Sequence, residues 1–349
     1  MRKNAPVGVG VVGLGFMGFT HFQAGLKLRG GRVVAIVTSD PRKAKGDFRG
    51  VRGNFGSGGG KIDLDGITVH SSLESMLKDA SVELVDLCLP SHLHRAAALQ
   101  CLAAGKNVLV EKPIALTPAD AKRMLDGARK AKRLLLVGQV LKFFPEFSLL
   151  EDALGDRRWG DLIALHLRRR IAKPDWGAGS WFADSKKSGG MVVDLHIHDT
   201  DFITHLFGRP RAVSSQGLLR QGRVDFIRTT YHFEKSRGRG AASPLITSEA
   251  GWVNAPGLAF THGYDAYFEE ATIHFDSFRS PQPTIYEKKG PRVLKLKAVD
   301  GFIQELEAAA VAVRSGRVPP RLSAESAARS LEICHAEETS ARTGRMVTL

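Results

Sequence analysis

The sequence predicts an α/β chain of two domains: a doubly wound parallel sheet, then an α+β domain with a large, mostly antiparallel open sheet. Over the first third, short apolar runs alternate with helical patterns, as in right-handed βαβ units. Later, strand-like runs follow one another without helices between them, which is typical of antiparallel sheets. A length of 349 residues is also long for one domain. We expect domains at 1–139 and 140–349.

Apolar periodicity sets the elements of the first domain. The expected strands are Val7–Val12, Val33–Val37, Ile67–His70, Leu84–Leu89, Asn107–Val110 and Leu134–Val137. The expected helices are Met17–Leu28, one beginning near Pro41, Leu73–Leu77, His92–Ala104 and Pro118–Lys132. The glycine-rich and charged stretch Gly50–Gly66 is expected to be a loop insertion.

The second domain has a different pattern, with helices near its ends and strands between them. The expected helices are Phe147–Leu154, Gly190–Phe207, Phe302–Arg314 and Ala324–Thr343. The expected strands are Leu162–Ile171, Ala212–Leu218, Val224–Phe233, Leu245–Trp252, Ala266–Phe275 and Val293–Leu296. One face of this sheet would expose a large apolar surface unless covered, so we expect a homodimer or homotetramer.

Composition excludes several classes of protein. At 43% hydrophobic the chain can bury a sizeable core. It contains no apolar run of membrane-spanning length and no signal-peptide pattern. Cys88, Cys101 and Cys334 stand in apolar contexts, which indicates reduced core thiols rather than disulfides. These features together favour a cytoplasmic protein without a membrane partner.

The net charge of +14 allows two interpretations. A strongly basic chain can bind nucleic acid. The densest basic stretch, Arg168-Arg169-Arg170 with Lys173, is however interrupted and lacks interleaved aromatic residues. We therefore favour diffuse surface charge and an anionic small ligand over a nucleic-acid partner.

A glycine motif occurs in two overlapping registers, Gly8-x-Gly10-x-x-Gly13 and Gly13-x-Gly15-x-x-Gly18. Only the second follows a strand and opens a helix, as a dinucleotide-binding turn requires. There Gly13 makes the tight turn, Gly15 lets the backbone approach the pyrophosphate, and Gly18 allows close packing. Phe16 and Met17 open the helix, whose N-terminus faces the phosphates. The motif predicts a Rossmann domain that binds NAD or NADP.

The choice between the two nucleotides depends on the end of the second strand, where an acidic residue would favour NAD. This chain has Thr38 and Ser39 there, with Asp40 slightly late and Arg42-Lys43 close behind. Hydroxyl groups beside two cations suit a 2′-phosphate, so we hypothesise that NADP is accepted. The alternative is that Asp40 merely caps a helix.

The segment Val108-Leu-Val-Glu-Lys-Pro-Ile114 carries a lysine at the carboxyl end of a buried strand. That edge of a parallel sheet is where ligands bind. Pro113 restricts the backbone of Lys112 to extended geometry, so the ammonium is held in one direction. The plain alternative is a surface lysine at a strand end.

A second polar group follows Gly189-Gly190 on the helix expected over 190–207. Asp194, His198 and Asp201 are spaced four and three apart, which places them on one helical face. A carboxylate one turn from an imidazole can orient the ring for service as a general base. The alternative is that these side chains bond only to backbone.

The glycine turn, the Glu-Lys-Pro segment and the Gly-Gly…Asp…His segment, in this order, resemble the Gfo/Idh/MocA oxidoreductases. The resemblance spans nearly the whole chain. It implies hydride transfer between nicotinamide and a secondary alcohol, or ketone, of a sugar or polyol. Lys112 would polarise the substrate oxygen, His198 would remove the hydroxyl proton and Asp194 would orient His198. It also implies that Glu111 and Lys112 border the cofactor and that the Lys112–Pro113 bond is cis.

The resemblance extends to weaker positions. In Leu89-Pro90-Ser91-His92-Leu93-His94, Pro90 and His94 match the family string beside the nicotinamide ribose, whereas Leu89 and Ser91 depart from it. Packing would explain His94 equally well. Lys142 occupies a position that the family often fills with arginine, so it would contact substrate or brace the domain junction.

Other polar and aromatic residues leave alternatives open. Trp176 and Trp181 could stack on a sugar ring or anchor the core. His166, Arg168 and Arg170 alternate along one strand, where they could line an anion pocket or form a solvated face.

Three rival functions remain. Paired histidines, His92 with His94 and His196 with His198, would suit a zinc hydrolase, although a helix would separate the second pair. We therefore expect no metal. The others are a non-catalytic cofactor-binding regulator and an NAD-dependent glycosidase of the same superfamily.

Overall fold

A computed structural model describes residues 5–53, 58–172, 181, 184–234, 243–253, 255 and 257–349. Trp176 and Lys173, singled out above, lie outside these residues. The chain forms two compact units. The first comprises Met1–Phe143 and Asp300–Ala328, and the second Phe144–Val299 and Arg329–Leu349.

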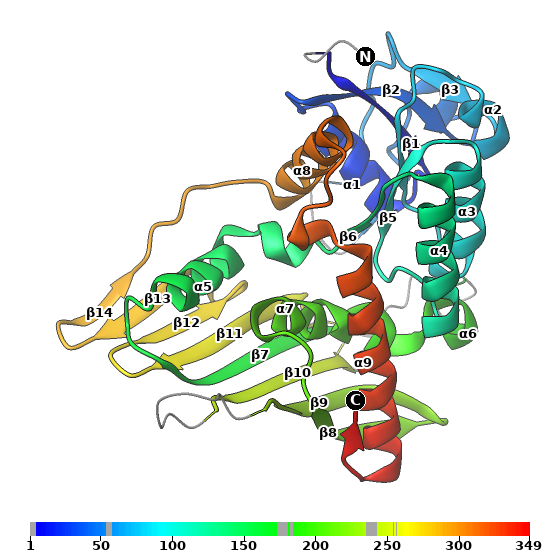
Figure 1. Cartoon of the computed structure of the whole chain (residues 1–349). Coiled ribbons are helices and arrows are strands. Elements are labelled where there is room, and N and C mark those ends of the chain that lie inside the picture. Colours follow the sequence, from blue (N-terminus) through cyan, green and yellow to red (C-terminus); the bar gives the residue numbers. More distant parts are fainter. Residues whose placement is uncertain are drawn as a thin grey trace. The chain divides into compact units, whose positions relative to one another are not determined.

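The first unit is built on a six-stranded parallel sheet with strand order β3-β2-β1-β4-β5-β6 (Figure 1). The strands are β1 Val7–Val12, β2 Gly31–Val37, β3 Thr68–His70, β4 Leu84–Leu87, β5 Asn107–Glu111 and β6 Leu135–Gly138. Every residue of β1 and β4 is buried, as expected for central strands covered on both faces. The order reverses between β1 and β4, so ligands are expected at the carboxyl ends of these strands. The predicted doubly wound sheet is confirmed.

Helices of the first unit come from both ends of the chain. They are α1 Phe16–Gly25, α2 Leu73–Leu77, α3 His94–Ala103, α4 Pro118–Ala131 and α8 Gly301–Ser315. α4 begins where Thr117 Oγ1 accepts the N–H of Asp120 and Pro118 takes the first helical position.

Residues 300–328 join the first unit, whereas the sequence division placed everything after 139 in one domain. The apolar side of α8, with Leu306, Ala309 and Ala310, is buried, and the helix packs against α1. Asp300 caps its N-terminus by accepting the N–H of Phe302. Sequence separation hides this association, because nothing local marks which sheet an amphipathic helix covers.

The helix predicted near Pro41 is wrong. The structure has only a short 3₁₀ turn, Lys43–Lys45, before the chain turns inward. Phe48 is fully buried and packs against Phe19 and Phe22 at ring-centroid distances of 5.0 and 5.6 Å. The chain turns inward to bury the Phe48 ring, and this turn replaces the helix that the sequence predicted.

The second unit is built on a nine-stranded sheet with order β14-β13-β12-β11-β7-β10-β9-β8-β15 (Figure 1). The strands are β7 Leu162–Ala172, β8 Ala212–Arg220, β9 Arg223–His232, β10 Leu245–Val253, β11 Thr261–Phe268, β12 Thr272–Asp276, β13 Ser280–Glu287, β14 Gly290–Val293 and β15 Val347–Thr348. Only β7 and β10 pair in parallel. The predicted mostly antiparallel sheet is confirmed.

Helices cover one side of this sheet. α5 Pro145–Asp156, α7 Ile197–Phe207 and α9 Ala324–Thr343 lie there (Figure 1), and α6 is the short helix Ser185–Ser188. Phe147 of α5 forms the centre of an aromatic cluster with Phe202, Tyr264 and Phe275. These buried rings attach the helices to the sheet.

Several strand predictions need correction. The single strand predicted over Ala266–Phe275 is two antiparallel strands, β11 and β12, because the chain reverses at Glu269-Glu270. The strand predicted over Val293–Leu296 ends at Val293. β13 was not predicted, since Pro281 and Pro283 interrupt its pattern, and neither was the two-residue β15.

The uncovered face of the second sheet is polar, which corrects the expectation of a large apolar surface. His166, Arg168 and Arg170 alternate with buried apolar residues of β7 and lie on this face. Each contacts a residue on a neighbouring strand: His166 Nδ1 lies 2.8 Å from Thr247 Oγ1, Arg168 pairs with Asp265, and Arg170 Nε donates to Glu249 Oε1 at 3.0 Å. These contacts favour the solvated strand face over the anion pocket.

Two expectations from composition can be compared with the structure. Cys88, Cys101 and Cys334 are buried and unlinked, as predicted. Among the described residues, no helix combines the length and apolarity needed to cross a bilayer.

Candidate active site and cofactor-binding edge

The turn after β1 fits a dinucleotide pyrophosphate. Gly13 has a φ of 88°, a left-handed conformation that favours glycine. A Cβ on Gly18 would lie 1.8 Å from the carbonyl oxygen of Gly13, so only glycine allows this packing. Around Gly15, in contrast, a Cβ would meet nothing within 4 Å. The turn is therefore tight at Gly18, where it packs, and open at Gly15, next to the N-terminus of α1 at Phe16 and Met17, where the motif predicts phosphates.

The ribose edge lies beyond β2 and carries mixed charge. A cavity of about 400 Å³ is lined by Asp40, Arg42, Lys43, Asp47, Arg49 and Gly50. Lys43 Nζ donates to the carbonyl oxygen of Leu14 at 2.8 Å, which ties this edge to the glycine turn. Thr38 Oγ1 accepts the N–H of Asp40, and Asp40 Oδ1 accepts the N–H of Arg42. Asp40 therefore stabilises a local turn, whereas the alternative interpretation expected it to cap a helix, which does not form here.

His94 is buried, with its ring nitrogens each 2.8 Å from a backbone carbonyl oxygen, those of Pro113 and Leu89. Burial lowers the pKa of His94 below its ordinary value, more than the two carbonyls raise it. Both nitrogens face protein atoms, so the ring braces the loop after β4 against the turn after β5. This geometry favours the packing interpretation of His94. Leu89 and Pro90 precede it on the same loop.

Lys112 immediately follows β5, and its bond to Pro113 is cis, as the resemblance implied. The backbone N–H of Lys112 donates to Oε2 of Glu111 at 2.9 Å. Glu111 is only 5% exposed. Its carboxylate therefore points into the protein and fixes the Lys112 backbone rather than bordering a ligand.

A buried ionic cluster lies behind this segment, and sequence analysis missed it. His21 of α1 donates from Nδ1 to Asp86 Oδ2 at 2.9 Å, and its Nε2 lies 2.9 Å from Oε1 of Glu111. Glu305 of α8 lies 3.9 Å from the same nitrogen. All four side chains are almost completely buried. The one available signal was Asp86, a carboxylate inside an otherwise apolar strand.

In the second unit, Asp194 and His198 lie on a helix that begins irregularly. Gly189 and Gly190 have φ values of 83° and 73°, which explains the glycine pair. Val192–His196 then forms a π-helical turn, and α7 begins at Ile197. π-turns occur frequently at functional sites. The sequence predicted one continuous helix, because a π-turn has no distinct apolar pattern.

Asp194 and His198 are half-buried, but Asp201 is fully buried and accepts a hydrogen bond from Ser330 Oγ at 3.1 Å. The predicted grouping of Asp194, His198 and Asp201 is therefore corrected: Asp201 does not belong with the other two. Asp201 belongs to the packing of α7 against α9.

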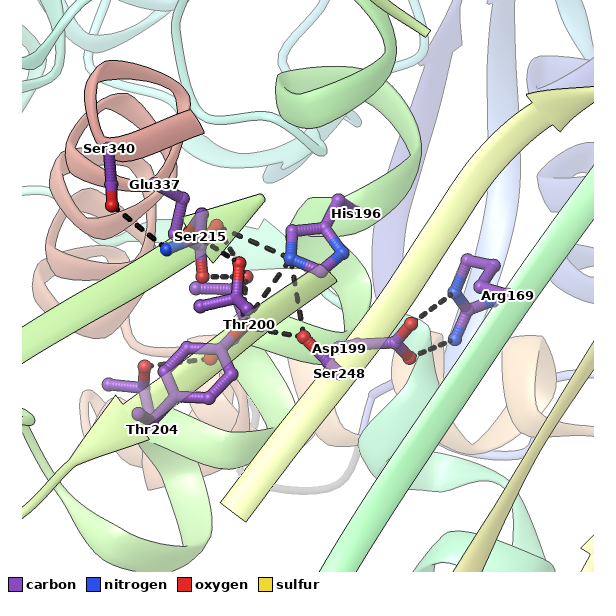
Figure 2. A network of polar contacts seen from close by, with 11 residues as sticks. Arg169, His196, Asp199, Thr200, Thr204, Ser215, Ser248, Glu337 and Ser340 are labelled. Carbon is purple, nitrogen blue, oxygen red and sulfur yellow. Dashed lines mark hydrogen bonds and ion pairs between the residues drawn. The ribbon is translucent and has the colours of Figure 1, made fainter. Parts of the chain in front are cut away.

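His196 belongs to a buried polar network beneath the π-turn (Figure 2). Its Nε2 lies 3.2 Å from Ser248 Oγ and 3.5 Å from a carboxylate oxygen of Glu337. Thr200 Oγ1 lies 3.1 Å from both oxygens of Glu337. Figure 2 also shows Asp199 paired with Arg169 of β7, with Arg169 Nη2 donating to Oδ1 at 2.7 Å. This network attaches the start of α7 to the sheet and to α9.

The remaining candidates have different surroundings. Lys142 is 1% exposed and lies near Glu305 inside the first unit, which supports bracing rather than substrate contact. Trp181 is half-buried in the second unit.

The histidines of the zinc hypothesis do not form metal-binding groups among the described residues. The groups found there are His21-Asp86-Cys88 and His21-Glu111-Glu305. His94 and His196 are instead engaged by carbonyl, hydroxyl and carboxylate groups.

The sheet, the glycine turn and the lysine at the carboxyl edge define a dinucleotide-binding protein, and comparison with known families agrees. Residues 7–139 match the family described as an oxidoreductase family with an NAD-binding Rossmann fold. Residues 147–273 match the GFO/IDH/MocA C-terminal domain. The chain belongs to the Gfo/Idh/MocA oxidoreductase family, and its first domain is an NAD-binding Rossmann domain.

Several relatives are dehydrogenases by name. The chain is 34% identical over 241 residues to inositol 2-dehydrogenase 1 of Saccharopolyspora erythraea, covering 68% of this chain and 60% of that protein. It is 30% identical over 224 residues to trans-1,2-dihydrobenzene-1,2-diol dehydrogenase of Homo sapiens, covering 62% and 61%. The chain thus spans about three fifths of the length of these curated relatives, and 51% of an oxidoreductase from Schizosaccharomyces pombe.

Solved structures share the fold over the full chain. Levoglucosan dehydrogenase in complex with NADH and levoglucosan superposes with a TM-score of 0.80 at 20% identity, covering 99% of both chains. A protein described as a probable dehydrogenase, from Thermotoga maritima, gives a TM-score of 0.75 at 22% identity, covering 98% of both chains.

Proposed function

We propose that the chain is an NAD(P)-dependent oxidoreductase acting on a secondary alcohol of a sugar or polyol, or on the corresponding ketone. The observation that carries the proposal is the position of Lys112 at the carboxyl edge of β5. The glycine turn follows β1 at the same edge of the same sheet, with β4 between the two strands. An ammonium fixed at the edge where a dinucleotide binds can act on the oxygen of the reacting alcohol.

The proposed roles follow from side-chain chemistry. Lys112 donates a hydrogen bond to the substrate oxygen and stabilises the negative charge that develops on it. His198 accepts the hydroxyl proton during oxidation and returns it during reduction. Asp194 orients the His198 ring and favours its protonated form. Lys112 and Trp181 are the residues we propose for substrate contact, together with Asp194 and His198.

The residues proposed to hold the cofactor are those of the glycine turn and the neighbouring strand ends. Gly13, Gly15 and Gly18, with the first turn of α1, would receive the pyrophosphate. Thr38, Ser39, Arg42 and Lys43 would receive the adenosine ribose, and Leu89 and Pro90 the nicotinamide ribose. When bound, NAD(P) supplies or accepts the hydride.

The proposed substrate class is supported by the names of the relatives. Inositol and dihydrobenzenediol are cyclic compounds with secondary alcohols, and levoglucosan is an anhydrosugar. These compounds share a ring carbon that carries both hydroxyl and hydrogen, which is the group that hydride transfer requires.

The first experiment screens both nucleotides, oxidised and reduced, against a panel of sugars and polyols. On the substrate found, Lys112→Met and His198→Asn should each lower kcat by at least about 100-fold. NADH affinity, measured by fluorescence titration, should stay within about threefold, because neither side chain is proposed to hold the nucleotide tightly.

Matched controls separate catalysis from folding. The exposed Lys122 of α4 pairs with its helix neighbour Asp126, and His205 lies on the same helix as His198. Lys122→Met and His205→Asn should retain normal turnover. Unchanged turnover in Lys112→Met would favour a regulator. Hydrolysis of a glycoside without net change in nicotinamide absorbance would favour a glycosidase.

A further inference from the structure

His21 holds an unusual position for an ionisable side chain. It lies in the middle of α1, six residues after the glycine turn opens the helix, and is fully buried. Each ring nitrogen lies near a carboxylate from a different strand. Nδ1 forms a hydrogen bond with Asp86 of β4 at 2.9 Å, and Nε2 lies 2.9 Å from Oε1 of Glu111 of β5, an ion-pair contact that lacks hydrogen-bond alignment. A neutral imidazole has one N–H donor, whereas an imidazolium has two. Two carboxylates at ion-pair distance, one on each side of the ring, therefore favour the charged form.

The charges around His21 support this protonation state. Burial alone would lower the pKa of His21, but Asp86 and Cys88 together outweigh it and raise the pKa well above its ordinary value. Burial likewise tends to raise the pKa of Glu111, yet His21 and Lys112 hold it below the usual range. Both directions support an imidazolium at His21 between the carboxylates of Asp86 and Glu111.

Glu305 supplies a third carboxyl group to the same nitrogen. Neither of its oxygens has a hydrogen-bond partner among the described residues, and a Cβ on Gly138 would lie 3.1 Å from Oε1. Burial, with Glu111 and Asp86 nearby, raises the pKa of Glu305 to about 8. At neutral pH Glu305 is mainly protonated and neutral, so Glu111 is the charged partner of His21 Nε2. The other ionisable groups acting on this cluster are Cys88, His94, Lys112 and Lys142.

The cluster reaches Lys112 through Glu111. Oε1 of Glu111 contacts His21, and Oε2 accepts the backbone N–H of Lys112 at 2.9 Å. One carboxylate therefore connects the helix after the glycine turn to Lys112, the residue that follows β5. Rotation of the Glu111 side chain would break both contacts at once.

Resting on the proposed function, we propose that His21 is a positioning residue for Lys112. Its imidazolium holds Glu111 between Asp86 and the Lys112 backbone, and this fixes the direction of the lysine at the carboxyl edge of β5. Because α1 also follows the phosphate-binding turn, His21 sets the lysine relative to the same helix that receives the cofactor.

The first test uses the wild-type chain and needs no substrate. Nitrogen NMR of the imidazole, with the His21 signal assigned by its loss in His21→Gln, should show both ring nitrogens protonated at pH 7 and still at pH 8. A neutral His21 ring at pH 7 would overturn the proposal. Stoichiometric zinc that disappears in His21→Gln would also overturn it, because a metal ion would occupy Nε2 in place of the proton.

The second test measures the position of Lys112 directly. In His21→Gln and in Glu111→Gln, the Lys112 amide should exchange with deuterium at least about tenfold faster, while the Leu109 amide within β5 stays protected. Turnover should fall about 10- to 100-fold, with the substrate KM within about threefold. His70→Gln is the control, since His70 lies on β3, outside the His21 cluster, and its ring pairs with Asp79 at 3.4 Å.

The outcomes distinguish the two proposals. Unchanged Lys112 exchange in both variants overturns the positioning role, whatever the activity. Faster exchange together with full turnover in Lys112→Met supports the positioning role of His21 and overturns the proposed function of the lysine. Glu111→Gln is nearly isosteric, so it keeps the test decisive if His21→Gln fails to fold.

Discussion

Arg42 and Lys43 are adjacent cations with different surroundings at the ribose edge. Lys43 is held by the carbonyl oxygen of Leu14 at 2.8 Å. The Arg42 side chain is 73% exposed, and its Nη2 lies 3.6 Å from Oδ2 of Asp40. An exposed ion pair of this kind is weak, so Arg42 can reorient at small cost. Arg42 is therefore the side chain best suited to a 2′-phosphate, and Asp40 to a 2′-hydroxyl.

We expect Arg42→Ala to raise the KM for NADP about tenfold while changing the KM for NAD less than about twofold, since only the phosphate needs the guanidinium. Steady-state kinetics with both nucleotides measure this. Arg49→Ala is the matched control, because Arg49 lines the same cavity but is paired with Asp47 through two hydrogen bonds. Equal changes for both nucleotides would contradict the role of Arg42.

At the scale of elements, the local sequence predicted the helices and strands that have a regular apolar periodicity. β1, α2 and α9 have the expected bounds. A fully buried run marks β1, and the Ser72 cap marks the start of α2. Elements that depend on distant partners were missed. The chain after Pro41 turns inward to bury Phe48, and β13 forms although two prolines interrupt its pattern.

The candidate site divides in the same way. The glycine turn and Lys112 could be predicted because each depends on a short segment next to a strand. The His21 cluster could not, because Glu305 comes from α8, far along the chain, and pairing between α1, β4, β5 and α8 is set only by packing. When its partners are unknown, a charged residue that is buried cannot be told from an exposed one by sequence.

The docking of α8 gives a pH prediction. The folded chain retains the Glu305 proton up to a pKa of about 8, whereas an unfolded glutamate loses it near 4.5. Stability from this group is therefore complete below about pH 4.5 and lost as pH rises through about 8. The glutamine of Glu305→Gln stays neutral. As pH rises through this window, the unfolding free energy of the variant minus that of the wild type should therefore increase by up to about 1.4 kcal/mol per pH unit.

Urea unfolding at pH 6 and pH 8.5 measures this difference. His21 contributes in the same direction above its unfolded pKa, because its folded pKa is also raised. His21 is present in both proteins, so its contribution to the pH dependence of the unfolding free energy largely cancels when the two are compared. If the unfolding free energies of wild type and Glu305→Gln change with pH in the same way, Glu305 is ionised in the folded chain at neutral pH.

At the scale of the whole molecule, the uncovered face of the nine-stranded sheet bears on assembly. Among the described residues, the helices of the second unit lie on its other side. Tyr267 and Tyr286 are 44% and 49% exposed, and each pairs in register with Thr272 between them. Tyrosine and arginine beside satisfied ion pairs are typical of protein–protein interfaces. The polar face thus supports the proposed oligomer for a different reason from the one the sequence suggested.

We propose that a second copy of the chain covers this face, and we expect sedimentation velocity to show a homodimer or homotetramer at micromolar concentration. Tyr267→Glu with Tyr286→Glu should weaken self-association by at least about tenfold, because two buried carboxylates would lack partners in the interface. Val311→Glu is the control, since Val311 is exposed to a similar extent, 50%, but lies on α8 of the first unit. A monomeric wild type would exclude the oligomer, and an assembly that tolerates both glutamates would exclude this face as its interface.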